Sequence, residues 1–156
     1  MKINGNSLPT KLMSLVEDGL WGKLPEKRDY LETIYSGPVN SLKTLELYGL
    51  NLMKLETEGL IEHCAPSYEY SDSFKIFLGE LDEEYEPGDI EFSRAIVIGD
   101  LGIGSDAPIA LDYRQDKNNP SVVILHWFRS EDKIKTRWLR IADSFDEFWQ
   151  AVCVEG

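Results

Sequence analysis

The sequence predicts a single domain in which helices and strands share one hydrophobic core. Its 156 residues are the usual size of one domain, and 42% of them are hydrophobic, which is enough to bury a core. Strand-like segments separated by turns fill the second half of the chain, from Ala95 to Ala142. Segments with apolar residues at helical spacing come before and after them.

The segment Ala95–Tyr113 is the centre of this prediction. Two apolar stretches flank its turn, and a chain reversal there would pair them as neighbouring strands. Three glycines within six residues indicate positive φ angles or a close approach of two backbones. We expect the two aspartates to accept hydrogen bonds from amide groups of the turn, which is a structural role. These turn residues are Gly99, Asp100, Gly102, Gly104 and Asp106.

The N-terminal part predicts two amphipathic helices. In Leu8–Gly19, Pro9 stands at a first helical position, and apolar residues recur at helical spacing until a glycine ends the segment. In Leu24–Tyr35, Pro25 begins a second helix in the same way. The pattern of Val39–Leu55 fits a strand at first and a helix later, so both alternatives stay open.

An acidic segment, Glu80–Glu91, carries seven carboxylates and no lysine or arginine. Since like charges at this density repel one another, we expect an exposed loop or a solvated edge. Two interpretations remain: a solubilising surface, or a patch that meets a basic partner. Before it, Ala65–Asp72 is a turn-rich loop, and Phe74–Leu78 fits either a strand or the end of a helix.

The C-terminal half predicts the second strand of Ala95–Tyr113 and two further strands. Pro108–Arg114 alternates apolar and polar residues, the period of a strand with one buried face. A loop at Gln115–Pro120 reverses the chain, and Ser121–Phe128 is apolar on both faces, so it should lie in the middle of a sheet covered on both sides. Lys135–Ala142 follows a polar turn at Ser130–Lys133.

The last segment, Asp143–Cys153, is the best specified helix of the chain. Ser144 and Glu147 match a capping box, the arrangement that satisfies the free amides at a helix start. Four apolar residues then follow at helical spacing and form a stripe typical of a core. They are Phe145, Phe148, Trp149 and Val152.

The charge of the chain limits its partners. Its 28 acidic and 16 basic residues give a net charge of −12, which repels a phosphate backbone and an anionic membrane surface. We therefore expect no nucleic acid and no membrane as a direct ligand. The charge itself fits either plain solubility or attraction to a basic protein. Without an export signal at the N-terminus, and with only Cys64 and Cys153 as thiols, we expect a cytoplasmic location.

No motif predicts catalysis or a bound cofactor. Gly102–Ala107 matches the spacing of a dinucleotide fingerprint, but Pro108 opens a strand where that fingerprint needs a helix. His63 is isolated, and His126 falls in the buried strand, where a hydrogen-bonded core histidine is expected. We expect no metal site. One alternative is a metal-dependent enzyme that uses three aspartates as oxygen ligands: Asp100, Asp106 and Asp112.

The order of these C-terminal elements resembles that of the SUKH superfamily, which includes eukaryotic regulators of cell-wall synthesis and many bacterial immunity proteins. The resemblance covers residues 90–150 most clearly. It rests on a strand ending in Ile98–Asp100, the turn Gly102–Asp106, the strand Pro108–Tyr113, a strand after Pro120, and the closing Trp138 with Ile141–Phe148. At the N-terminal end, Leu24-Pro25 and the helix after it match a family element, although Ser36-Gly37 replaces the family's usual ending.

The resemblance implies an α+β fold over residues 1–156, with a central, mostly antiparallel sheet, packed helices and a C-terminal helix at 144–153. It also implies binding without catalysis, because bacterial members neutralise toxin domains, often nucleases, by protein contact. We therefore expect a cognate toxin with a basic surface as the partner. An alternative is an intracellular scaffold or a small-ligand-binding regulatory module. From the charge of the acidic segment, and with Tyr68 and Tyr70 as aromatic anchors, the residues that we expect to bind the toxin are Tyr68, Tyr70, Asp82, Glu83, Glu84, Tyr85, Glu86 and Asp89.

Overall fold

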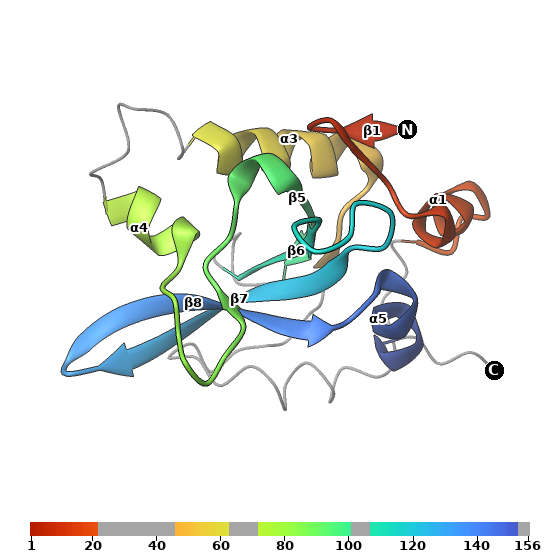
Figure 1. Ribbon diagram of the computed structural model, residues 1–156. Helices are drawn as coiled ribbons and strands as arrows, with labels where there is room; N and C mark the ends of the chain where they lie inside the picture. The colour runs from red at the N-terminus through yellow and green to blue at the C-terminus, as the bar shows by residue number, and fades with distance from the viewer. Residues whose placement is uncertain (22–45, 63–71, 101–106, 153–156) are drawn as a thin grey trace.

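A computed structural model of the chain describes residues 1–21, 46–62, 72–100 and 107–152 (Figure 1). Within these ranges, a six-stranded sheet has the order β3-β5-β6-β7-β8-β4, and every neighbouring pair is antiparallel. The α+β class, the antiparallel sheet and the C-terminal helix are therefore confirmed. The sheet strands are β3 (Glu46–Leu47), β4 (Pro87–Gly88), β5 (Ala95–Asp100), β6 (Pro108–Asp112), β7 (Ser121–Ser130) and β8 (Lys133–Ala142).

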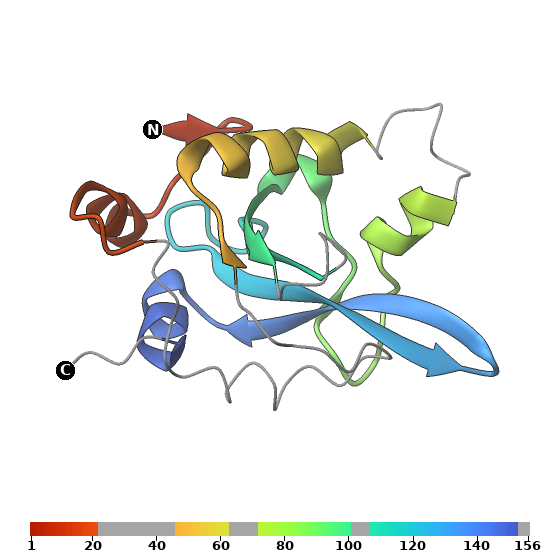
Figure 2. The ribbon, with the colours of Figure 1, turned by 180° about the vertical axis from the view of Figure 1, so that it is seen from behind.

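Helices cover one face of the sheet and one of its ends. Helix α3 (Leu50–Glu62) crosses over β5, and α4 (Asp72–Leu78) lies on the same side of the sheet, over β8 (Figures 1 and 2). At the other end, α1 (Thr10–Glu17) and α5 (Phe145–Val152) pack against each other. No helix among the described residues is long and apolar enough to cross a bilayer.

Strands β5 and β6 form the hairpin that the sequence predicts. Their register runs from Ala95 opposite Asp112 to Asp100 opposite Pro108. A Cβ added at Gly99 would lie 2.5 Å from the carbonyl oxygen of Glu46, so this glycine serves a close approach of two backbones. The Oδ2 atom of Asp100 accepts the amide of Ala107 at 3.2 Å, as expected. Gly102, Gly104 and Asp106 lie outside the described residues.

The prediction of one buried face for Pro108–Arg114 is wrong. All five residues of β6 are buried, including Ala110 and Asp112 on the face that was expected to be polar. The strand lies between β5 and β7 in the middle of the sheet, and residues on both of its faces are buried. The alternation misled because the Asp112 charge is balanced by Arg114, which allows the carboxylate to be buried.

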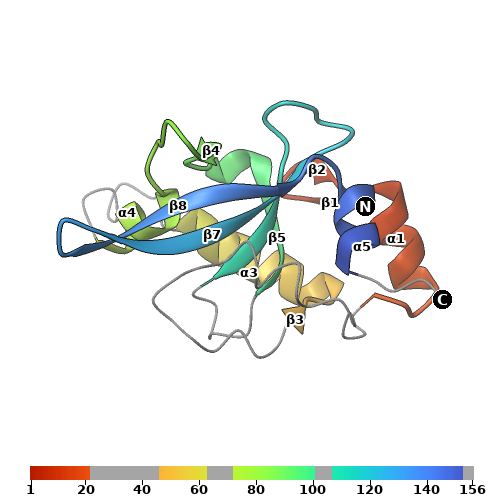
Figure 3. The same ribbon diagram turned by 90° about the horizontal axis from the view of Figure 1, so that it is seen from below.

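Strands β7 and β8 form a long hairpin that extends beyond the helices (Figure 3). The first six residues of β7 are buried, as the apolar sequence predicts, and β7 continues to Ser130. At the predicted polar turn, Glu131 and Asp132 have φ angles of 51° and 61°. Two successive positive φ angles are typical of a type I′ turn, whose twist suits a two-residue hairpin.

Helix α5 begins as its capping sequence predicts. Ser144 Oγ accepts the amide of Glu147 at 3.2 Å, and Glu147 Oε2 accepts the amide of Asp143 at 3.1 Å. Three residues of the apolar stripe, Phe145, Phe148 and Trp149, are buried, and the Trp21 ring lies 5.7 Å from that of Phe145 and 5.6 Å from that of Trp149, measured between centroids. These three residues therefore belong to the core.

The two ambiguous segments are now assigned. Glu46 and Leu47 form β3 and the residues from Leu50 onward form α3, so Val39–Leu55 contains both a strand and a helix. Phe74–Leu78 is the end of α4. The predicted helix Leu24–Tyr35, most of the loop Ala65–Asp72, and both cysteines lie outside the described residues.

A short N-terminal hairpin was not predicted. It joins β1 (Lys2–Ile3) to β2 (Asn6–Ser7) through Asn4 and Gly5, whose φ angles are 55° and 75°. Asn-Gly between two strands is a strong type I′ signal in a sequence, so the signal was present. The Asn4 side chain donates to the carbonyl of Phe92 at 3.1 Å, which attaches the hairpin to the 3₁₀ turn before β5.

Candidate functional site

The acidic segment forms a closed loop on the edge of β8. We call residues 79–89 the acidic loop. Its ends meet, because the amide of Ile90 donates to the carbonyl of Leu78 at 3.0 Å and Gly79 pairs with Asp89. Compact loops with adjoining ends, of the Ω type, are frequently functional.

Two glycines allow the ends of the acidic loop to meet. Gly79 and Gly88 have φ angles of 78° and 79°, in the region that other residues rarely adopt. A Cβ at Gly79 would lie 2.5 Å from the Gly88 carbonyl oxygen, and a Cβ at Gly88 would lie 2.6 Å from that of Glu80. Both conformation and space therefore require glycine at these positions.

The acidic loop passes around the edge of β8 from one face of the sheet to the other. On the α4 side, the Thr136 hydroxyl donates to the Ile76 carbonyl at 2.6 Å. The Trp138 indole donates to the Phe77 carbonyl at 3.0 Å. Since alternate residues of a strand point to opposite faces, Arg137 projects from the other side. There its Nη1 lies 2.8 Å from Oδ2 of Asp82.

Arg137 is held between two aromatic rings. Its guanidinium carbon lies 3.9 Å from the centroid of Tyr85 and 4.1 Å from that of Phe128. Its Nε donates to Nδ1 of His126 at 3.3 Å, so this buried histidine is hydrogen-bonded, as the sequence predicts. The Arg137 guanidinium contacts both rings and the Asp82 carboxylate, and it therefore fixes the middle of the acidic loop on the sheet.

Asp82 is stabilised as a carboxylate. Its Oδ1 accepts the amide of Glu84 at 2.8 Å, and its Oδ2 pairs with Arg137. The hydrogen bond from Glu84, followed by that from Arg137, lowers the pKa of Asp82, although partial burial opposes the shift. The charge that fixes the loop is therefore present at neutral pH.

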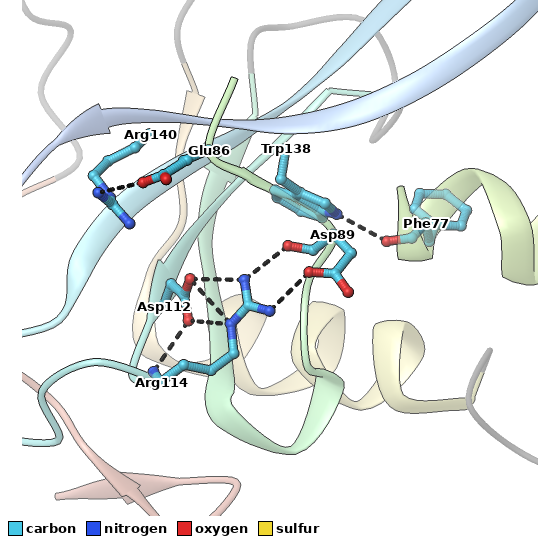
Figure 4. A network of polar contacts seen from close by, with 7 residues as sticks. All are labelled: Phe77, Glu86, Asp89, Asp112, Arg114, Trp138 and Arg140. Carbon is cyan, nitrogen blue, oxygen red and sulfur yellow. Dashed lines mark hydrogen bonds and ion pairs between the residues drawn. The ribbon is translucent and has the colours of Figure 1, made fainter. Parts of the chain in front are cut away.

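Arg114 fixes the C-terminal end of the acidic loop (Figure 4). Its Nη1 lies 2.9 Å from Oδ1 of Asp89, and its Nη2 donates to the Asp89 carbonyl at 2.8 Å. The same guanidinium pairs with Oδ2 of Asp112 at 3.1 Å. Burial alone would lower the pKa of Arg114, but hydrogen bonds to Asp112 and Asp89 outweigh this effect and raise the pKa.

Weaker ion pairs join the rest of the segment to neighbouring cations. Glu80 lies 3.5 Å from Lys135, and Glu91 lies 3.6 Å from Arg94. Glu86 lies 3.7 Å from Arg140, and its side chain is 77% exposed. Among the described residues, Glu83 and Glu84 form no ion pair. The uncompensated charge of the acidic loop is therefore concentrated at these two adjacent glutamates.

The outer surface of the acidic loop combines this charge with apolar groups. Leu81 is 78% exposed and Tyr85 is 40% exposed, on either side of the two exposed glutamates. The structure thus brings together six of the residues expected from the sequence: Asp82, Glu83, Glu84, Tyr85, Glu86 and Asp89. Tyr68 and Tyr70 lie outside the described residues. The sequence did not lead us to include Leu81 in this surface, although an apolar residue between Glu80 and Asp82 in an exposed acidic segment was a signal for it.

Two of the three aspartates of the alternative enzyme hypothesis, Asp100 and Asp112, lie too far apart to bind the same metal ion. Asp100 ends β5, whereas Asp112 lies opposite Ala95 at the other end of the hairpin. Five residues at about 3.4 Å each separate these positions by roughly 17 Å, too far for one ion. Within the ranges that the structure describes, no three histidine, cysteine or acidic side chains are grouped for a metal ion.

Comparison with known proteins adds no relative: no family model, curated protein or solved structure matches the chain. The SUKH resemblance therefore stays a prediction. The class of protein defined so far is an α+β fold that carries an ordered acidic loop on the edge of its sheet.

Proposed function

We propose that this protein is a non-catalytic immunity protein that binds a cognate toxin through the acidic loop and blocks it. The observation that supports this most is the division of charge in the loop. Asp82 and Asp89 pair with arginines of the sheet region, whereas Glu83 and Glu84 face outward without a counter-ion among the described residues. A loop held in one conformation loses little entropy when it binds.

The composition of the exposed surface supports a protein partner. Tyrosine is enriched at the centres of interfaces, and Tyr85 rests on Arg137 with 40% of its surface exposed. Leu81 adds apolar area beside it. The two glutamates would pair with lysines or arginines at the rim. A protein partner with a basic surface, such as a nuclease that attracts phosphate, would pair with the glutamates and pack against Tyr85 and Leu81.

The overall charge of −12 would accelerate the encounter with such a partner. Complexes steered by charge associate faster at low salt, and their association slows as salt screens the field. We propose that this encounter takes place in the cytoplasm, where an immunity protein would protect its own cell. A direct nucleic-acid ligand does not fit the same charge.

The test is coexpression with the product of the adjacent reading frame, followed by measurement of growth and of affinity for the purified partner. We expect the wild-type chain to relieve toxicity and to bind less tightly as salt rises. Replacing both glutamates (Glu83→Lys with Glu84→Lys) should weaken binding and flatten the salt dependence. A control with the same charge change on exposed helix positions (Glu17→Lys with Glu58→Lys) should bind almost normally. Equal loss in both variants, or no protection by the wild type, would refute the proposal.

A further inference from the structure

A cavity of about 270 Å³ lies between α3, α4 and the β5–β6 hairpin. Its floor is apolar and contains the buried residues Leu60 and Val97. Phe77 closes one side from α4, and Pro108 from the start of β6. The volume is just below the range of drug-sized ligand pockets, which favours a smaller molecule. None of the described residues that line the cavity belongs to the acidic loop.

Gly59 lines this cavity, in the C-terminal half of helix α3. Glycine destabilises a helix interior relative to alanine, so a glycine at this position calls for a reason. Packing against the described residues does not supply a reason, because beyond the backbone of its own helix a Cβ added at Gly59 would meet none of their atoms within 4 Å. This contrasts with Gly79, Gly88 and Gly99, where a Cβ would collide with the backbone. At Gly59, the missing side chain leaves open space at the wall of the cavity.

Two carboxylates border the cavity. Glu56 is half-buried and Glu62 is exposed, and both line the pocket from α3. Six residues of helix separate them by about 9 Å along the axis. Neither forms an ion pair with another described residue. An apolar floor with negative charge at its border repels anions and suits a molecule with an alkyl body and a cationic end.

We propose that this cavity binds a small linear aliphatic amine. The alkyl chain lies along Leu60, Phe77 and Val97, and the ammonium group meets Glu56 or Glu62. Apolar contact supplies the affinity, and the carboxylates select the amine over neutral and anionic molecules of the same shape. This site is independent of toxin binding, so either proposal stands if the other fails.

The test uses hexylamine as the probe, with hexan-1-ol and hexanoate as neutral and anionic controls. Calorimetric titration of the whole chain should show hexylamine binding about tenfold more tightly than hexan-1-ol, the difference that one charged hydrogen bond provides. Hexanoate should bind most weakly. Replacing both carboxylates (Glu56→Gln with Glu62→Gln) should abolish the preference for the amine, whereas Glu58→Gln on the same helix should preserve it.

The variant Gly59→Leu separates the ligand site from folding. Leucine is a good helix former, and its side chain would enter the cavity, so the melting temperature should stay equal or rise while hexylamine binding is lost. Equal affinity for the amine and the alcohol would overturn the proposal. So would undetectable hexylamine binding to the wild type, or unchanged binding to the leucine variant.

Discussion

Replacing Arg114 with methionine should destabilise the protein strongly, because this guanidinium is the counter-charge of a buried carboxylate. The side chain of Asp112 is only 4% exposed, and its Oδ2 lies 3.1 Å from Nη2 of Arg114. Arg114 also fixes the end of the acidic loop through Asp89. Methionine has a similar length but neither the charge nor the donors. The substitution would therefore leave the Asp112 carboxylate buried and unpaired.

The magnitude follows from the burial of the pair. Removing one partner of a buried ion pair costs about 3–5 kcal/mol. Since the Arg114 side chain is 23% exposed, water would partly solvate the remaining carboxylate. We therefore expect a loss near the lower limit, about 3 kcal/mol in the free energy of unfolding. The variant Arg114→Lys keeps the charge but not the forked geometry, so it should lose about half as much.

The assay is urea denaturation at pH 7, with the unfolding free energy extrapolated to water. The double variant Arg114→Met with Asp112→Asn removes the unpaired charge and should recover part of the lost stability. Arg94→Met is the control, because Arg94 is 55% exposed and lies 3.6 Å from Glu91. This control should change stability by less than about 0.5 kcal/mol. The reasoning is wrong if Arg114→Met costs no more than the control, or if the double variant is no more stable than the single one.

Three further predictions concern the same chain. Gly79→Ala should lower the free energy of unfolding by more than about 2 kcal/mol, because Gly79 has a positive φ angle and lies close to the Gly88 carbonyl. Gly59→Ala should raise it by about 0.5–1 kcal/mol, so urea denaturation of the two variants should give changes of opposite sign. Because the pKa of Asp82 is lowered in the folded protein, its carboxylate stabilises the fold fully above the pKa of the unfolded chain, and this stabilisation is lost as pH falls. The loss in unfolding free energy caused by Asp82→Asn should therefore shrink between pH 6 and about pH 3. A loss that stays constant over this range would contradict the prediction. Ser144→Ala should cost about 1 kcal/mol by removing the cap of α5, which thermal unfolding would detect and an unchanged melting temperature would disprove.

Local patterns predicted the elements that depend on local chemistry. The capping residues Ser144 and Glu147 identified α5 because a cap is formed within four residues of the chain. The uninterrupted apolar run of β7 identified a strand covered on both faces. Polarity misled in β6, because Asp112 is charged and yet buried, and the pairing with Arg114 that permits this is a tertiary feature.

The sequence predicted where the candidate site lies, but not which contacts hold it in place. The density of charge between Glu80 and Glu91 indicated the segment, whereas the two cations that fix the acidic loop, Arg114 and Arg137, lie far away in the sequence. Arg137 is separated from Asp82 by 55 residues, and such a pair cannot be assigned without the sheet register. The cavity beside Gly59 was missed for the same reason, since four elements of the chain form its walls.

The position of the acidic loop also affects how copies of this protein meet one another. Strand β8 is one of the two longest strands of the described sheet, and an uncovered long strand is a template for strand-by-strand polymerisation. The backbone of the acidic loop occupies part of that template, through the hydrogen bonds between Glu80 and Thr136 and between Arg140 and Glu86. A second copy approaching there would bring another Glu83 and Glu84 against the first pair. The glutamates that we assign to recognition of a basic toxin thus also disfavour self-association at this edge.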